Sequence, residues 1–590
     1  MGIVDRIRGC DMMDQALAIG IDDFREVRAG DYYYIDKTLL IKDFIRYKNK
    51  VSLITRPRRF GKTLNVTMLR EFFDITKDSK EIFKGLAIMD TEYATQLNTR
   101  PVIYLTFKNC SGRIIEEMYI SLAKAIRAEY LRYESLFGDA VDQASNDYFA
   151  FYQIYNMLKE VREKEGGSGE KKSYKIDITL LKSGLTELMK SVSAFFDQNP
   201  IVLIDEYDQP LIKAHDMGFR ESFSKGVYGS LLGDALKGND YLGQALLTGI
   251  QRVAKESIFS EVNNFVVYTV VDDIYAPYFG LTERETSRAL QCYGFELTDE
   301  IRNYYDGYIF GEVEIYNPWS ILKYIHKNKL YPYWINTSTN ALIRELISNA
   351  DVDFMEGFEE LIKDGEVEAY VNLEASFMEL EAPETLWGLL VNSGYLTVAH
   401  ELGEEAYILK IPNQEVKKEF RSIVATYAGF GENRVHQLFS ALSNRNIGRF
   451  LKIYQKLVYD CVSYHDVNSV DANENDPHEN SYHMLFLGMA ISMSGMYKPK
   501  SNRESGDGRS DIIMRSLQPD LRPHIVFEFK QGEAVAELKQ EALDQIFEKK
   551  YYVELHGNVL CVGIAHNKKK CELVHKEIVV DAYGDFVIGV

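Results

Sequence analysis

The chain has 590 residues, a length that predicts about three domains. Hydrophobic residues make up 46% and charged residues 26%, which predicts an ordinary soluble globular protein. The net charge of −20 speaks against a general nucleic-acid coat protein, so a DNA-binding surface would have to be a local basic patch on an acidic body.

The sequence also speaks against a membrane or exported protein. No apolar run approaches the roughly 18 residues that span a bilayer, and the first residues lack a signal-peptide core. Six cysteines are scattered without a C-x-x-C pair, which argues against zinc or a disulfide framework. We therefore expect a cytoplasmic protein with no membrane partner.

Residues 1 to about 280 alternate apolar, strand-like runs with helical stretches. Helices between such runs imply a mostly parallel sheet covered on both faces, which is an α/β fold. The segment Lys164–Lys172 contains Gly-Gly-Ser-Gly between charges and is expected to be a flexible exposed insertion. The strand-like runs are Val51–Ile54, Val102–Phe107, Ile201–Ile204 and Ala245–Thr248.

The segment Ser52–Thr63 has the pattern of a P-loop between a strand and a helix. In this pattern backbone N–H groups and a helix N-terminus hold phosphates, a lysine reaches the β/γ-phosphates and a hydroxyl binds Mg2+. Gly61, Lys62 and Thr63 match, whereas Arg56 stands where the first glycine belongs. Of the arginines 56, 58 and 59 we expect only one to contact nucleotide; Arg59 is our candidate, and the sequence leaves open which of the three contacts phosphate.

A second part of an ATPase site follows in Pro200–Glu206, an apolar run that ends in Asp-Glu as a Walker B strand does. Asp205 would hold Mg2+ through water, and Glu206 would orient the attacking water. The alternative is that these segments are ordinary parts of the hydrophobic core without a nucleotide site. This alternative is much less probable for the two segments together than for either segment alone.

The pattern becomes mostly helical from about Phe279 to Ser440. Thr282 and Glu285 predict a capping box at the start of a helix. Residues 441 to 466 read as an amphipathic helical stretch, and the polar segment Val467–His478 reads as a loop.

Glu528 and Lys530 share one face of an expected strand, because residues two apart in a strand point the same way. A hairpin would bring Asp511 beside Glu528. Two carboxylates and a lysine on a small sheet form a Mg2+ site with a cation to hold a water or a phosphate oxygen. The alternative is an exposed strand face with an ordinary Glu/Lys pair.

Two further pairs of residues lie before and after this set, Glu479 with His483 and Gln545 with Lys549. The two residues of each pair are four positions apart, so on a helix they would share one face. Glu479 could complete the site, whereas His483 is more simply a packed side chain. Gln545 and Lys549 are equally well explained as a solvated face.

These segments together resemble a bacterial family that joins an AAA-ATPase-like domain to a C-terminal PD-(D/E)XK nuclease-superfamily domain. The resemblance covers the chain from about Ile21, and the arginine-rich P-loop is the form that this family has. It is carried by Tyr34–Thr38, Arg56–Thr63, Ile204–Asp208, Leu247–Ser257, Tyr305–Tyr308, Tyr316–Ser320 and the set of Asp511, Glu528 and Lys530.

The resemblance implies three domains, at residues 1–280 (AAA-ATPase-like), 281–440 (helical lid or middle domain) and 441–590 (nuclease-like). It implies that Thr248 is a sensor residue near the γ-phosphate and that Gln545 points toward the nuclease-type site. For Thr248, a hydroxyl that is simply hydrogen-bonded within its sheet is an equal alternative. Arg252 or Lys255 could be an arginine-finger equivalent or a surface cation, and we assign the nucleotide contact to Arg252.

Two functions remain open from the sequence. The first is an ATPase coupled to a divalent-metal-dependent nuclease, with Glu206, Asp511, Glu528 and Lys530 as catalytic residues. It needs ATP and Mg2+, with Mn2+ as an alternative at the C-terminal site, and acts on nucleic acid, expected to be DNA. The second is an ATP-regulated binding or signalling module whose nuclease-like domain does not cleave. An oligomer is compatible with both, and a metabolic kinase is disfavoured because no acceptor site is seen.

Overall fold

The computed structural model divides the chain into two compact units, Met1–Ser338 with Glu368–Glu415, and Thr339–Val367 with Val416–Val590. Each unit is described by itself below. The residues that the structure describes are 15–161, 176–251, 265–334, 353–354, 357–358, 360–361, 365–373, 383–427, 432–465, 496–505, 508–567, 570–581 and 583–588.

The first unit is built on a five-stranded sheet in the order β2-β3-β4-β1-β5, in which every neighbouring pair is parallel. Strands β1 and β3 are buried at every position, as expected for a parallel sheet covered on both faces. The four predicted strand runs are therefore confirmed. The strands are β1 (Val51–Thr55), β2 (Val102–Thr106), β3 (Ile201–Asp205), β4 (Gln244–Gly249) and β5 (Phe265–Tyr268).

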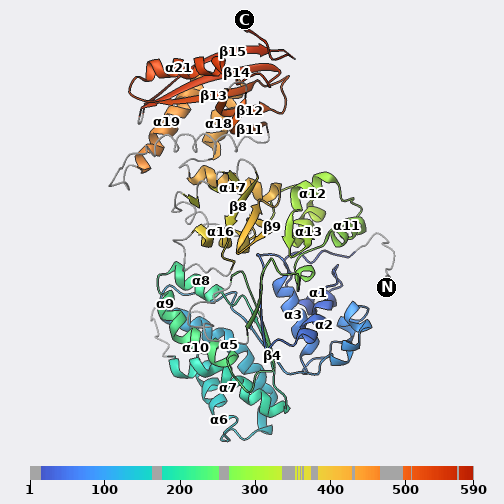
Figure 1. The fold of residues 1–590 in the computed structure, drawn as a ribbon. Helices are drawn as coiled ribbons and strands as arrows, with labels where there is room; N and C mark the ends of the chain where they lie inside the picture. The colour runs from blue at the N-terminus through green and yellow to red at the C-terminus, as the bar shows by residue number, and fades with distance from the viewer. Residues whose placement is uncertain are drawn as a thin grey trace, which may run out of the picture. The chain divides into compact units, whose positions relative to one another are not determined.

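Helices cover both faces of this sheet (Figure 1). One face buries Leu53, Leu105 and Ile204 in a large apolar cluster with α5, α6, α7 and α10, and α3 packs against β2, β3 and β4 on the sheet. The longer helices are α2 (Leu39–Tyr47), α3 (Lys62–Phe73), α5 (Ile115–Phe137), α6 (Phe149–Glu160), α7 (Ile178–Phe196), α8 (Gln209–Asp216) and α10 (Gly229–Leu236), with α1 (Phe24–Ala29), α4 (Lys80–Phe83) and α9 (Arg220–Phe223) as short ones.

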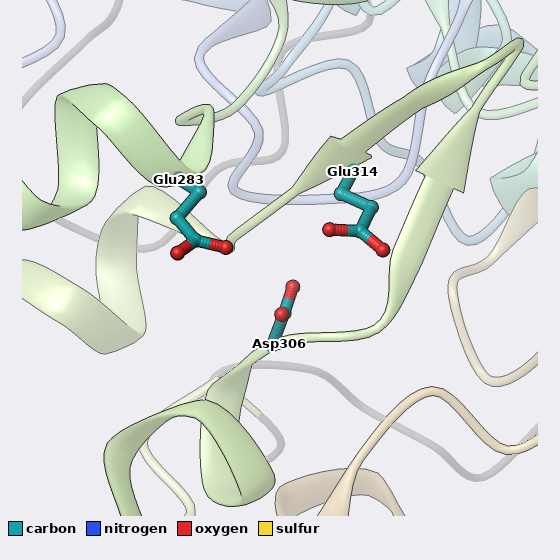
Figure 2. Close-up of side chains that lie close together, drawn as sticks. All are labelled: Glu283, Asp306 and Glu314. Carbon is teal, nitrogen blue, oxygen red and sulfur yellow. The ribbon is translucent and has the colours of Figure 1, made fainter. Parts of the chain in front are cut away.

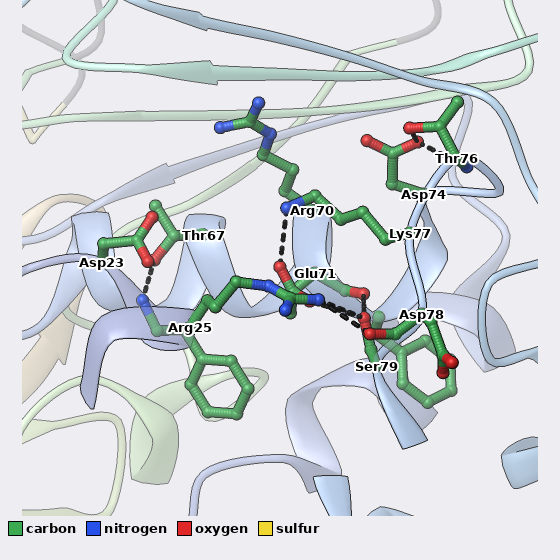
Figure 3. Close-up of polar contacts among 12 residues, drawn as sticks. Asp23, Arg25, Thr67, Arg70, Glu71, Asp74, Thr76, Lys77, Asp78 and Ser79 are labelled. Atoms are coloured by element: carbon green, nitrogen blue, oxygen red, sulfur yellow. Dashed lines mark hydrogen bonds and ion pairs between the residues drawn. The ribbon is translucent and has the colours of Figure 1, made fainter. Parts of the chain in front are cut away.

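A buried carboxylate fixes helix α3, whose N-terminus begins at the P-loop. Glu71 is 2% exposed and accepts hydrogen bonds from Arg25 at 2.5 Å, from Lys77 at 2.7 Å and from the hydroxyl of Ser79 (Figure 3). Burial alone would raise the pKa of the Glu71 carboxyl, but these three hydrogen bonds lower it below its ordinary value. The network ties α1 and the segment after α3 to α3 itself, the helix that begins at Lys62.

The part of the first unit that follows β5 is rich in helices, as predicted, and also contains short strands. The capping box at α11 is present, with Thr282 as N-cap and Glu285 as its partner. The elements are α11 (Glu283–Cys292), α12 (Asp299–Tyr305), β6 (Tyr308–Phe310), β7 (Val313–Ile315), α13 (Pro318–Lys327), β8 (Glu366–Tyr370), α16 (Pro383–Asn392), β9 (Thr397–Gly403) and β10 (Ala406–Lys410). Strands β6 and β7 form a hairpin, and β8, β10 and β9 form a small sheet.

The second unit is a six-stranded mixed sheet in the order β11-β12-β13-β14-β15-β16. Strands β13 and β14 are parallel, and the other neighbours are antiparallel. The α/β fold class with a C-terminal mixed-sheet domain is thus confirmed. The strands are β11 (Tyr497–Ser505), β12 (Gly508–Ser516), β13 (His524–Gln531), β14 (Gly557–Asn567), β15 (Lys570–Val580) and β16 (Phe586–Ile588).

Helices cover both faces of this sheet as well (Figure 1). Phe527 packs with α18 (Glu432–Ser443) and α19 (Ile447–His465), whereas Val526 packs with α21 (Val535–Glu548) on the other face. Residue 528 alternates with Phe527, so Glu528 lies on the face that α21 covers. Helix α17 (Gln414–Tyr427) precedes α18 in the chain.

Several predictions fall outside the described residues, namely the insertion 164–172, the loop 467–478, Glu479, His483, Arg252 and Lys255. The structure separates into two compact units, and the division into three domains stays a prediction. Among the described cysteines, Cys110, Cys561 and Cys571 are free and buried. Within the described part of the chain, every helix is too short or too polar to cross a bilayer.

Candidate functional site: two phosphate-chemistry centres

The P-loop runs from the end of β1 to the start of α3. Gly61 caps α3 in a left-handed conformation, with φ of 86°, which a residue without a side chain adopts at no steric cost. The ammonium of Lys62 donates to the carbonyl oxygens of Arg56 at 2.8 Å and Pro57 at 2.9 Å. Burial lowers the pKa of Lys62 to about 8, against the opposing charge of Glu206. A cation is thereby held inside the loop whose backbone would surround phosphate.

Asp205, at the end of β3, joins two hydroxyls that come from different elements, helix α3 and strand β4. Its Oδ2 accepts from Thr63 Oγ1 at 2.7 Å, and its Oδ1 accepts from Thr248 Oγ1 at 2.7 Å. Strand β4 lies between β1 and β3, and it therefore places Thr248 between the P-loop and the Asp-Glu pair. Hydroxyl and carboxylate oxygens are hard ligands of the type that Mg2+ prefers, so the residues present fit a magnesium nucleotide.

Glu206 follows Asp205 in a strained backbone conformation, with φ of 53°. Such a left-handed conformation costs free energy for a residue other than glycine and is concentrated at functional sites. Burial raises the pKa of its carboxyl, while the nearby charge of Lys62 lowers it.

The arginines of the loop lie in different surroundings. Arg56 is fully buried and donates to the carbonyl oxygens of Tyr268, the last residue of β5, and of Thr269, and burial lowers its pKa to about 9. It therefore ties the loop to the end of β5. Arg59 is exposed, and its guanidinium lies 4.6 Å from the ring centre of Trp319. Its nucleotide contact stays a prediction.

Two charged residues near this centre were not selected from the sequence. Asp208 is buried and accepts the backbone N–H groups of Ile250 and Gln251 at 2.7 and 3.0 Å, which fixes the turn after Thr248. Lys108, just beyond β2, pairs with Asp22 at 2.7 Å. Asp208 could have been found from the sequence, because it belongs to the Ile204–Asp208 motif. No sequence motif marks Lys108, because its position near this centre depends on the pairing of β2 with β3.

A cluster of three acidic side chains lies in the region after β5. Glu283, Asp306 and Glu314 come from α11, the end of α12 and β7, and their carboxylate oxygens lie within 4.8 Å of one another (Figure 2). Arg302 already pairs with Glu283 at 2.9 Å. Partly exposed carboxylates with an arginine partner are common on protein surfaces, so we assign no metal to this group.

The second centre lies in the C-terminal sheet. Glu528 is 3% exposed, and the side-chain amide of Gln545 on α21 donates to its Oε1 and to the hydroxyl of Tyr551. Lys530 lies two residues further along β13 and is half-buried. The structure thus brings Gln545 to Glu528, as the family resemblance implied, whereas Lys549 is exposed at the end of α21.

Strand register places Asp511 near Glu528 along the backbone. Strands β12 and β13 pair Ile512 with Phe527 and Ile513 with Val526, and the next residue on each strand is Asp511 and Glu528. The side chain of Asp511 lies outside the described residues. The metal role of the two carboxylates therefore stays a prediction.

Comparison with known families matches both centres. Residues 18–259 match the model of a predicted AAA-ATPase, the AAA-ATPase-like family, and residues 477–576 match the PD-(D/E)XK nuclease superfamily. The chain therefore joins an AAA-ATPase-like domain to a C-terminal PD-(D/E)XK nuclease-superfamily domain. It is similar to a protein of Azotobacter chroococcum mcd 1 described as uncharacterized and encoded in the vnfD 5' region, with 28% identity over 416 residues, or 69% of each chain.

Proposed function

We propose that the protein binds and hydrolyses ATP at the N-terminal centre and that this activity is coupled to a divalent-metal-dependent nuclease at the C-terminal centre. The observation that carries the first half is the Asp205 carboxylate, which holds the hydroxyls of Thr63 and Thr248 beside the buried Lys62. These are the cation, hydroxyl and carboxylate that a magnesium nucleotide requires at the end of a parallel sheet.

The residues of the N-terminal centre have distinct tasks in this proposal. Gly61 and the backbone N–H groups of the loop hold phosphate, and Lys62 supplies positive charge to the β/γ-phosphates. Thr63 and Asp205 hold Mg2+, which neutralises developing charge when bound. Glu206 orients the attacking water. Thr248, Arg59 and Arg252 are proposed as further contacts to the nucleotide.

At the C-terminal centre Asp511 and Glu528 would hold the metal ion, Mg2+ or Mn2+, which supplies a hard cation to polarise the scissile phosphate. Lys530 would hold the attacking water beside it. Gln545 supports this by fixing the orientation of the Glu528 carboxylate. We propose nucleic acid, with DNA as the expected substrate, and a cytoplasmic location.

The second candidate is an ATP-regulated module with a nuclease-like domain that does not cleave. The strongly acidic chain, with a net charge of −20, favours it because a phosphate backbone is repelled by an acidic body. The set of Asp511, Glu528 and Lys530 counts against it.

One experiment separates the two candidates. The full chain is incubated with plasmid, linear DNA and RNA, with Mg2+ or Mn2+, and with or without ATP. Cleavage that needs the metal and responds to ATP supports the coupled nuclease. Steady ATP hydrolysis without cleavage under any of these conditions supports the non-cleaving module, and the absence of ATP binding contradicts both.

A further inference from the structure

The backbone of the P-loop is contacted by residues from far along the chain. The indole Nε1 of Trp334 donates to the carbonyl oxygen of Arg58 at 2.9 Å. Gly394 packs so closely on Pro57 that an added Cβ would lie 2.8 Å from the Cβ of Pro57. The part of the first unit that follows β5 is therefore built against the phosphate loop itself.

Trp334 is also tied to a buried carboxylate. Its backbone N–H donates to Glu415 Oε1 at 2.7 Å, and the hydroxyl of Ser320 donates to Oε2 at 2.8 Å. Glu415 is 1% exposed, and these donors help to stabilise its buried charge. One residue, Trp334, thus links the loop carbonyl of Arg58 to the carboxylate of Glu415.

Glu415 lies in the first turn of α17, where a negative charge is favourable near the helix N-terminus. The boundary between the two compact units falls directly after it, between Glu415 and Val416. The residues before the helix are fixed as well, because a Cβ at Gly307 would lie 2.0 Å from the carbonyl oxygen of Pro412. The start of α17 is thereby held in the first unit, and the chain passes into the second unit within this helix.

The hydrogen bonds inside the P-loop are expected to change when nucleotide binds. Lys62 donates to the carbonyl oxygens of Arg56 and Pro57, the residues directly before Arg58. An ammonium that reaches the β/γ-phosphates has to give up these carbonyls. The loop then loses two charge-assisted hydrogen bonds beside the carbonyl that Trp334 holds and beside the proline that Gly394 contacts.

We propose that Trp334 and Glu415 are positioning residues that transmit the nucleotide state of the P-loop to the start of α17. This inference rests on the proposed binding of ATP by the first unit, and it names the route by which that binding reaches the helix leading into the second unit. The loop has two states: without nucleotide, Lys62 binds the loop carbonyls, and with nucleotide, Lys62 binds phosphate. The contacts from Arg58 to Trp334 and from Trp334 to Glu415 transmit the change between these states to α17.

The test is amide hydrogen exchange of the full chain, with and without Mg-ATP, read in α17 over residues 414–427. Trp334→Phe keeps an aromatic ring and removes the indole donor to Arg58, and Glu415→Gln keeps the size of the side chain and removes its charge. Trp387→Phe is the matched control, since Trp387 is a buried tryptophan of α16 in the same unit, 4% exposed. ATP affinity is measured by calorimetry on the same samples.

In the wild type and in Trp387→Phe, Mg-ATP should change the exchange rates of α17. Trp334→Phe should bind ATP within about fivefold of wild type, as loss of one neutral hydrogen bond predicts, and should lose the response of α17. Glu415→Gln should lose the response as well. Full response in Trp334→Phe overturns the inference, even if Glu415→Gln fails to fold. ATP binding by wild type without any response in α17 also overturns the inference but leaves the proposed function standing, whereas failure of wild type to bind ATP overturns both.

Discussion

Thr63 and Asp205 lie 142 positions apart in the chain, and a hydrogen bond of 2.7 Å joins the hydroxyl of Thr63 to the carboxylate of Asp205. Thr63 follows Lys62 in the first turn of α3, and Asp205 ends β3, two strands away from β1 in the sheet. The carboxyl ends of parallel strands meet at one edge of the sheet, which is where such folds bind ligands. Predictions about nucleotide chemistry therefore concern this edge.

Lys62→Ala should weaken binding of Mg-ATP by on the order of 100-fold, because two charge-assisted hydrogen bonds to phosphate contribute about 3 kcal/mol together. Isothermal titration calorimetry measures this directly. Lys84→Ala is a suitable control, since the Lys84 side chain is 73% exposed. Wild-type affinity in Lys62→Ala would show that the loop does not hold phosphate as proposed.

Glu206→Gln should bind Mg-ATP with nearly unchanged affinity and hydrolyse it about 100-fold more slowly or worse. The amide keeps the size of the side chain but does not accept a proton from the attacking water, and general-base catalysis is worth about 10²–10⁴ in rate. Phosphate release in steady state and nucleotide affinity should be measured on the same preparation. Equal loss of both would point to a folding defect instead of a catalytic role.

Glu71→Gln should lower the free energy of unfolding of the first unit by about 2 kcal/mol at pH 7, because Lys77 and the partly solvent-screened Arg25 would lose a buried charged partner. The pKa of Glu71 is lowered in the folded state, so its stabilisation is fully present above the unfolded value of about 4.3 and is lost as the pH falls through the lower folded value.

The difference between Glu71→Gln and wild type should accordingly shrink in acid. Urea unfolding of both proteins at several pH values measures it. A difference that stays constant from pH 7 down to pH 3 would show that the hydrogen bonds to Glu71 do not depend on its charge.

Lys530→Ala should retain metal binding and lose DNA cleavage, because both carboxylates remain and only the cation beside the water is removed. Glu528→Gln should lose metal affinity as well, since a hard anionic ligand is replaced by a neutral one. Metal binding by calorimetry with Mn2+ and cleavage of labelled DNA give the two readouts. ATP hydrolysis should survive both changes, and undiminished cleavage by Lys530→Ala would place the activity elsewhere.

Gln545→Ala should reduce metal affinity at the C-terminal centre by about 10–100-fold without removing a ligand, as found for residues that orient a ligand through a hydrogen bond. The side-chain amide of Gln545 donates to Glu528, so its loss leaves the carboxylate free to turn. Gln540→Ala, on the same helix and exposed, serves as the control. Excess Mn2+ should restore cleavage in Gln545→Ala if the defect is in affinity alone.

The sequence by itself determined many of the elements and the place of the proposed site residues within them. Apolar runs such as Ile201–Ile204 predict buried strands, and the alternation around Glu528 assigns its face, because strand periodicity is a local property of the chain. The capping box of Thr282 and Glu285 is equally local, since three residues separate its partners.

Only the tertiary structure decided which of these residues meet. Nothing local to Arg56 predicts that its guanidinium turns to the carbonyls at the end of β5 instead of toward the N-terminus of α3, because those acceptors are more than 200 positions away. The same holds for Trp334, which donates hydrogen bonds to the P-loop and to α17. Partner choice between distant segments depends on how the strands order and the helices pack, and a periodicity along the chain carries no information about that order.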